Sequence, residues 1–266
     1  MKKSRHYHLF LIGIIILLSA CSMNSTPNEN QEENIDLTIS AASSMVEVLE
    51  ELRTNFEQEN NTINVSFNFG SSGSLQQQIA HGAPVDIFIS AAEDKFHPLL
   101  DQGMIVDNYY TTIVENELVL IEPTHQDNKM MSFDDLLGEE VQTIAIGTPE
   151  TVPAGYYAKE LLENLELYDL LQEKLIPTKD VRQVLNYVET GNTRAGIVYR
   201  TDALSSNLVR IVETASKESH SPINYPIGVL KQSQQKEAAI LFFNYITSEK
   251  SLKIFEEYGF VPVRDS

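Results

Sequence analysis

Short apolar runs rich in β-branched residues alternate with amphipathic stretches through most of the chain. The apolar runs predict strands over residues 37–42, 63–69, 85–91, 117–121, 143–146 and 195–199. Helical spacing of apolar positions, together with start and stop residues, predicts helices over 45–58, 153–165, 248–258 and from Thr178 or Asp180 to Gly191. Strands that alternate with helices in this way are typical of the α/β class.

Two polar stretches, residues 107–117 and 200–207, flank a self-contained series of strands and helices. We interpret them as two crossings of the chain between lobes. This interpretation predicts a discontinuous first lobe, residues 35–112 joined with 202–266, and an inserted second lobe, residues 113–201.

The first twenty residues have the pattern of an export signal. Lys2, Lys3 and Arg5 precede an apolar run over 9–18 that is too short to span a bilayer. Small residues lead into Cys21, the one cysteine of the chain, in the order that lipoprotein signal peptidases recognise. We therefore predict a signal peptide over 1–20 and acyl chains such as palmitate on Cys21, although an ordinary buried thiol is the alternative. The product would be anchored at the extracytoplasmic face of the cell membrane.

Residues 21–34 contain almost nothing apolar, so they cannot offset the entropy of ordering and predict a flexible tether. About 230 residues follow, enough for one large or two medium cores. Removal of Lys2, Lys3 and Arg5 with the leader takes the formal charge from -19 to -22. An excess of negative charge of this size argues against nucleic acid as a partner and favours solubility.

Four segments join small or hydroxyl residues to the start of a predicted helix: 41–45, 70–75, 151–155 and 179–182. The first backbone N–H groups of a helix have no intrahelical partner, so each segment could bind an anion. Taken singly, each also matches an ordinary helix cap. Residues 70–74 are the most distinctive, because three serines and two glycines offer more donors and closer backbone approach than one cap requires.

A set of sequence runs resembles one family of binding proteins. The runs Ala-Ala-Ser-Ser (41–44), Gly-Ser-Ser-Gly-Ser-Leu (70–75), residues 82–91, Val-Pro-Ala-Gly-Tyr-Tyr-Ala-Lys (152–159) and Gly-Ile-Val-Tyr (196–199) are similar, in the same order, to the molybdate-binding proteins of bacterial molybdate importers. The resemblance covers about residues 36–262. It implies a two-lobed periplasmic-binding-protein fold of type II, with two crossovers, closing on molybdate or tungstate between the lobes. It also implies a monomer without a cofactor that delivers the anion to the permease and ATPase subunits of an ABC importer.

Carried over position by position, the resemblance implies ligand contacts at Ser44 and Ser72 in the first lobe and at Ala154, Val181 and Tyr199 in the second. The molybdenum oxyanion would be held through hydrogen bonds: hydroxyl and N–H groups from the serines, N–H groups from Ala154 and Val181, and the phenol of Tyr199. Two positions depart from the family pattern. Ser43 stands where the family often has Ala, and Gly73 interrupts what is often a run of serines.

Molybdate at neutral pH is fully deprotonated, so every oxygen accepts a hydrogen bond and a site of neutral donors suits it. Another tetrahedral oxyanion, such as sulfate, thiosulfate or phosphate, remains the alternative ligand. Two nearby carboxylates have simpler roles. Asp86 is expected to bond backbone amides, and Asp180 is expected to cap its helix. Arg182 is either an anion ligand or a residue that faces solvent or a neighbouring carboxylate.

A secreted hydrolase is the alternative enzyme class, since the turn at 70–74 is rich in serine. That turn does not read G-x-S-x-G, and the histidines of the mature chain, His81, His97, His125 and His220, stand in no motif with a serine or with metal-ligand spacing. His81 is most simply a cap at a helix end. The acidic residues do not form a calcium loop either. A protein of adhesion or display is the third class, and a binding protein without catalysis is the prediction.

Overall fold

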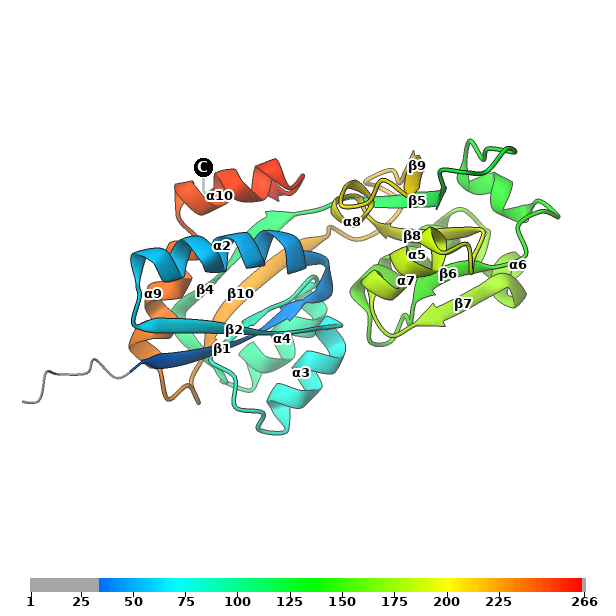
Figure 1. Cartoon of the computed structure of the whole chain (residues 1–266). Coiled ribbons are helices and arrows are strands. Elements are labelled where there is room, and N and C mark those ends of the chain that lie inside the picture. The colour runs from blue at the N-terminus through cyan, green and yellow to red at the C-terminus, as the bar shows by residue number, and fades with distance from the viewer. Residues whose placement is uncertain (1–33, 265–266) are drawn as a thin grey trace, which may run out of the picture. The chain divides into compact units, whose positions relative to one another are not determined.

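The computed structural model describes residues 34–264, which contain two mixed β-sheets (Figure 1). The first sheet has the strand order β11-β4-β10-β3-β1-β2. Its strands are β1 (Ile35–Ala42), β2 (Ile63–Gly70), β3 (Ile87–Ile89), β4 (Ile105–Glu115), β10 (Asn224–Leu230) and β11 (Val261–Pro262). Strand β1 runs parallel to β2 and β3, whereas β10 runs antiparallel to β3 and β4.

Helices cover both faces of this sheet. Successive side chains of a strand point to opposite faces, so Ile87 and Ile89 join one core cluster and Phe88 joins another. The first cluster includes buried residues of α2 (Val46–Glu59), α9 (Lys236–Ile246) and α10 (Glu249–Glu257). The second includes those of α3 (Ser72–Ala80) and α4 (Glu93–Asp101). A buried sheet with two covered faces explains why its central strands are apolar throughout.

The second sheet has the strand order β7-β6-β8-β5-β9. Its strands are β5 (Leu118–Pro123), β6 (Ile144–Gly147), β7 (Leu175–Thr178), β8 (Ala195–Tyr199) and β9 (Val209–Thr214). The associated helices are α5 (Pro153–Asn164), α6 (Tyr168–Leu171), α7 (Val181–Glu189) and α8 (Arg200–Leu204), with short 3₁₀ turns η2 (Phe133–Leu137) and η3 (Gln172–Lys174). Strands β6, β7 and β8 are parallel and β5 is antiparallel to its two neighbours.

The chain passes between the two sheets twice. It leaves the first after β4 and enters β5 through Asn116 and Glu117, and it returns from β9 to β10 through residues 215–223. The first passage lies inside the polar stretch 107–117, most of which belongs to β4. The second lies after 200–207, because β9 pairs with β5 in the second sheet. We therefore propose lobe boundaries at 116–117 and 215–223, which moves α8 and β9 out of the first lobe.

The predicted strands and helices agree with the observed ones within a few residues. Met45 belongs to a 3₁₀ turn, η1 (Ser43–Met45), that precedes α2. The predicted signal peptide (1–20), Cys21 and the tether up to residue 33 lie outside the described residues. Within residues 34–264, no helix combines the length and the apolar character that crossing a membrane requires.

Candidate functional site

The five residues predicted to contact a ligand, Ser44, Ser72, Ala154, Val181 and Tyr199, all line one small cavity. Its volume is about 10 Å³, which is roughly the space that one water molecule requires on this measure. The other lining residues are Ala42, Ser43, Gly70, Ser71, Ala91, Val152 and Pro153, so all twelve are uncharged. The sequence prediction thus names residues that the fold brings together, although they come from four separate helix starts and the end of one strand.

The first lobe contributes two hydroxyls at strand-to-helix turns. Ser44 lies in η1, directly after β1, and Ser72 is the first residue of α3, just after β2. Ser71 caps α3, because its hydroxyl accepts the N–H of Ser74 at 3.4 Å. The Ser72 hydroxyl is fully buried and accepts the backbone N–H of Ala91 at 2.9 Å. That bond uses a lone pair, so the hydrogen of Ser72 stays available for an acceptor in the cavity.

The second lobe contributes two helix starts. Helix α5 begins at Pro153 with no side-chain cap, which leaves the N–H of Ala154 in its unpaired first turn. Helix α7 begins at Val181, and its cap Asp180 accepts the N–H of Gln183 at 2.9 Å. Gly155 allows α5 to approach β6 closely, because a Cβ there would lie 2.0 Å from the carbonyl oxygen of Gly147. Both helix dipoles place partial positive charge at the cavity.

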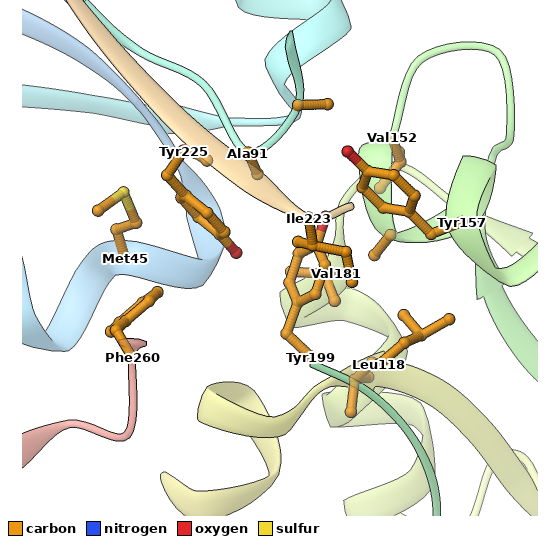
Figure 2. Packing of buried hydrophobic residues seen from close by; sticks show 14 of the residues in the cluster. Met45, Ala91, Leu118, Val152, Tyr157, Val181, Tyr199, Ile223, Tyr225 and Phe260 are labelled. Carbon is orange, nitrogen blue, oxygen red and sulfur yellow. The ribbon is translucent and has the colours of Figure 1, made fainter. Parts of the chain in front are cut away.

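Tyr199 ends β8 with its side chain 1% exposed (Figure 2). Its hydroxyl has no hydrogen-bond partner among the described residues. Burial, followed by the neighbouring Tyr225, raises the pKa of Tyr199 well above its ordinary value, so the phenol keeps its proton. A buried O–H without an acceptor is costly, so this hydroxyl favours an acceptor bound in the cavity.

The neighbouring polar residues have the simpler roles that the sequence indicated. Asp86 accepts the N–H of Thr38 at 2.8 Å and the Ser233 hydroxyl at 2.6 Å. The ring of His81, at the end of α3, bonds the carbonyl of Gln77 at 2.7 Å. Arg182 does not line the cavity; it pairs with Glu47 of α2 at 2.5 Å. The second of its two predicted alternatives, a neighbouring carboxylate, is therefore the observed one.

Three residues near the site have no counterpart in the sequence prediction. Tyr225 of β10 and Asn116 of the first passage are buried, and the Tyr225 hydroxyl lies 3.0 Å from that of Ser44. Asp202 in α8 is 1% exposed, and neither carboxylate oxygen has a hydrogen-bond partner among the described residues. Arg182 stands 3.9 Å from Asp202, too far for a hydrogen bond. Burial raises the pKa of Asp202 to about 7, although Arg182 opposes the shift.

Direct contacts join the two lobes beside the cavity. The N–H of Gly73 donates to the carbonyl oxygen of Thr151 at 3.0 Å, and Arg182 of α7 pairs with Glu47 of α2. A Cβ at position 73 would lie 2.6 Å from that oxygen. Gly73, the residue that interrupts the expected serine run, is therefore required by the close approach of the Thr151 backbone.

Larger hollows are also present among the described residues. One of about 470 Å³ is lined from β4, α9, α10 and the C-terminal segment, and one of about 230 Å³ is lined from residues 115–117 and 215–223. A third, of about 340 Å³, lies between α2, α8 and residues 257–260 and shares Ser44 with the small cavity. Residues 34–264 contain no group of three or more His, Cys, Asp or Glu side chains placed to hold a metal ion.

Comparison with known proteins agrees with this architecture. YvgL of Bacillus subtilis (strain 168), provisionally named as an ABC transporter substrate-binding lipoprotein, is 46% identical over 258 residues, which cover 96% of this chain and 98% of that protein. The molybdate-binding protein ModA of Escherichia coli (strain K12) is 35% identical over 231 residues, 84% of this chain and 88% of ModA.

A solved structure is similar over nearly the same length. The periplasmic molybdate-binding protein of Azotobacter vinelandii has a TM-score of 0.77 at 26% identity, covering 86% of this chain and all of that one, which confirms the two-lobed α/β fold. The sequence profile of the bacterial extracellular solute-binding proteins matches residues 37–261. The chain belongs to this family of bacterial extracellular solute-binding proteins.

Proposed function

We propose that this protein captures molybdate, or tungstate, in the small cavity and delivers it to the permease and ATPase subunits of an ABC importer. The observation that carries the proposal is the chemistry of the lining: twelve uncharged residues, among them the buried Tyr199 hydroxyl without a partner. Relatives named as molybdate-binding proteins, at 35% identity and below, support the choice of anion.

Donor counting explains how neutral groups hold a dianion. The hydroxyls of Ser44, Ser72 and Tyr199 and the N–H groups of Ala154 and Val181 all point donors toward acceptor oxygens in this proposal. Hydrogen bonds to a charged group contribute about 1.5–3 kcal/mol each, so several together supply the roughly 8–11 kcal/mol of micromolar or tighter binding after the costs of association. The acidic surface opposes the anion more weakly, because salt screens it beyond about 8 Å.

The site supports binding rather than catalysis. A nucleophilic serine needs a general base within hydrogen-bond reach. The Ser72 hydroxyl instead bonds the N–H of Ala91, and that of Ser44 bonds the phenol of Tyr225, whose pKa is raised well above the ordinary value by burial. Neither partner takes up a proton near neutral pH.

Calorimetric titration of residues 35–266 with molybdate, tungstate, sulfate and phosphate tests the proposal. Saturable micromolar or tighter binding of molybdate or tungstate is the expected result. Tighter binding of sulfate would move the protein to another oxyanion. No binding of any of the four anions would contradict an oxyanion site.

We further propose that the mature protein is held at the extracytoplasmic membrane face by acyl chains on Cys21. A close relative named as a lipoprotein supports this. Stable attachment depends on such chains, so Cys21→Ser should move the protein from the membrane fraction to the soluble fraction. Fractionation with a carbonate wash measures this, with Ser22→Ala as the matched control. Retention of Cys21→Ser in the washed membranes would contradict the anchor.

A further inference from the structure

The hydroxyl of Ser44 could either donate a hydrogen bond into the cavity or accept one. Which of these it does depends on a chain of buried groups that starts at Asn116. The amide oxygen of Asn116 accepts the N–H of Glu117 at 2.9 Å, which fixes the orientation of the amide. Its nitrogen then donates to the Thr201 hydroxyl at 2.9 Å and to the Tyr225 hydroxyl at 3.2 Å. Both amide hydrogens are thereby used.

Tyr225 is fully buried, so its hydroxyl hydrogen needs an acceptor within the protein. Asn116 presents a hydrogen to this hydroxyl and cannot accept one from it. The remaining partner is the Ser44 oxygen at 3.0 Å. If Ser44 donated to Tyr225 instead, the phenol hydrogen would be buried without a partner, which is the costly arrangement. Tyr225 therefore donates, and Ser44 accepts.

We propose that Asn116 and Tyr225 are positioning residues that fix Ser44 as a donor to the cavity, so that the site selects fully deprotonated oxyanions over those that carry a proton. The inference rests on the proposed function. Ser44 already accepts one hydrogen bond from Tyr225, so its own hydrogen is directed to the ligand. A ligand proton would then face donors and lack an acceptor.

The Ser72 hydroxyl is also directed into the cavity as a donor. Its oxygen accepts the N–H of Ala91 at 2.9 Å, so its own hydrogen is directed to the ligand. Burial, followed by the charge of Asp202, raises the pKa of Tyr225 well above its ordinary value, so the phenol of Tyr225 keeps its proton. The Tyr225 ring is held edge-to-face against Tyr199 at 5.9 Å and Phe260 at 5.5 Å between ring centroids (Figure 2).

The hydrogen bonds from Asn116 through Tyr225 to Ser44, here called the relay, also lie where the chain passes between the lobes. Asn116 is in the first passage, Tyr225 is in β10 just after the second, and Thr201 is in α8, the helix after β8. The orientation of one hydroxyl in the cavity thus depends on segments from both passages. A change in this region would alter the selectivity of the site without touching the ligand.

Sulfate and inorganic phosphate are the probes that isolate the ligand proton. They are similar in size and shape, and near neutral pH sulfate carries no proton whereas phosphate carries at least one. Titration of wild type and Tyr225→Phe with molybdate, sulfate and phosphate should show a roughly three- to tenfold loss for molybdate and sulfate. Phosphate affinity should stay the same or rise, because Ser44 can then turn an oxygen lone pair to the ligand. The discrimination ratio, which is the affinity for sulfate divided by the affinity for phosphate, should therefore fall at least roughly three- to tenfold.

Asn116→Asp tests the direction of the relay with Tyr225 in place. A carboxylate at this position has no hydrogen to donate and can accept the phenol hydrogen of Tyr225. Ser44 can then donate to Tyr225 and turn an oxygen lone pair to the cavity, so the ratio should fall here too. Thr201→Val is the matched control, since it removes the other acceptor of Asn116 and leaves the bond to Tyr225; its ratio should match wild type. Thermal unfolding verifies that each variant is folded.

Equal losses for all three anions in Tyr225→Phe, or an unchanged ratio in either Tyr225→Phe or Asn116→Asp, would overturn the relay. If wild type still bound molybdate, the proposed function would stand. If wild type bound none of the anions, the proposed function would fail and the relay with it.

Discussion

The two cavity serines differ in what else their hydroxyls do. Ser72 also satisfies the buried N–H of Ala91, so its removal affects folding as well as binding. Ser72→Ala should weaken molybdate binding by about 1–3 kcal/mol and lower the free energy of unfolding by a similar amount, because one donor is lost and one buried N–H is left unpaired.

Titration and urea denaturation measure the two effects of Ser72→Ala. Ser248→Ala is its control, since Ser248 caps the remote helix α10 by accepting the N–H of Ser251. It should lose about 1 kcal/mol of stability and no affinity. An unchanged stability of Ser72→Ala would contradict the bond to Ala91.

Tyr199 should show the opposite relation between stability and binding. Its buried hydroxyl has no partner among the described residues, so Tyr199→Phe removes an unsatisfied group from the empty protein. We expect an unfolding free energy equal to or above that of wild type without ligand, and a molybdate affinity weaker by about 1–3 kcal/mol. Denaturation without ligand and titration with ligand test the pair. A loss of stability without a loss of affinity would place the phenol outside the site.

Asp202 makes stability depend on pH in an unusual direction. Its pKa is raised from 3.8 to about 7 in the folded protein, so between these values the folded state holds more protons than the unfolded state. The contribution is full below the unfolded pKa and is lost as pH rises through the folded pKa. Replacing the carboxyl by an amide in Asp202→Asn removes this slope.

The stability advantage of Asp202→Asn over wild type should therefore grow by about 2–3 kcal/mol between pH 5 and pH 8. Urea denaturation at several pH values measures it. Asp86→Asn, at a residue whose oxygens accept two hydrogen bonds, is a control that should show no such gain. A constant difference across the range would mean that Asp202 is ionised at pH 5.

Five of the lining residues could be named from the sequence because its runs resemble those of the molybdate-binding proteins. Local patterns alone indicated four helix starts as possible anion sites, and Tyr199 came from the resemblance. Tyr225, Asn116 and Asp202 could not be named in either way. The roles of Tyr225 and Asn116 arise from hydrogen-bonded pairs 181, 109 and 85 positions apart in the sequence, such as Tyr225 with Ser44, and no local pattern indicates such pairs. Composition alone gives no sign that Asp202 is buried.

At the scale of elements, the predicted strands match β1, β2, β3, β5, β6 and β8, whereas β4, β7, β9, β10 and β11 had no counterpart in the prediction. Polar residues explain two of these omissions. Strand β4 has the sequence Ile-Val-Asp-Asn-Tyr-Tyr-Thr-Thr-Ile-Val-Glu, with exposed positions through its middle. Its polar residues were interpreted as a passage between lobes. Strand β9 has the same character, since five of its six residues are partly or fully exposed. Both pair along their length with a more buried strand, and that pairing makes them strands.

At the same scale, the anion site depends on where helices begin. Four starts, those of η1 with α2, α3, α5 and α7, meet at one cavity. Their unpaired N–H groups and dipoles are fixed by the strands that precede them, and glycines allow the close packing this requires. The sequence shows each start, and the parallel pairing of β1 with β2 and β3 explains why the ends of neighbouring strands meet.

At the scale of the whole molecule, Gly73 decides how closely the two lobes approach. Its N–H bonds the carbonyl of Thr151, and a Cβ in its place would lie 2.6 Å from that oxygen and 2.9 Å from the Thr151 Cα. Both are backbone atoms, so Gly73→Ala must push the lobes apart. Ala also favours helix α3 by about 1 kcal/mol over Gly, so the stability of the first lobe should not suffer.

We therefore expect Gly73→Ala to weaken molybdate binding at least tenfold while the unfolding temperature without ligand stays at or above that of wild type. A ligand closes a two-lobed protein by stabilising the closed state, and this variant cannot form the Gly73–Thr151 contact between the lobes in that state. Small-angle scattering with saturating molybdate should show less compaction than in wild type. Gln77→Ala, on the exposed face of α3, also introduces alanine into this helix, with a smaller gain in helix propensity and without the clash, and should bind and compact as wild type does. Wild-type affinity and compaction in Gly73→Ala would show that binding does not need the Gly73–Thr151 contact.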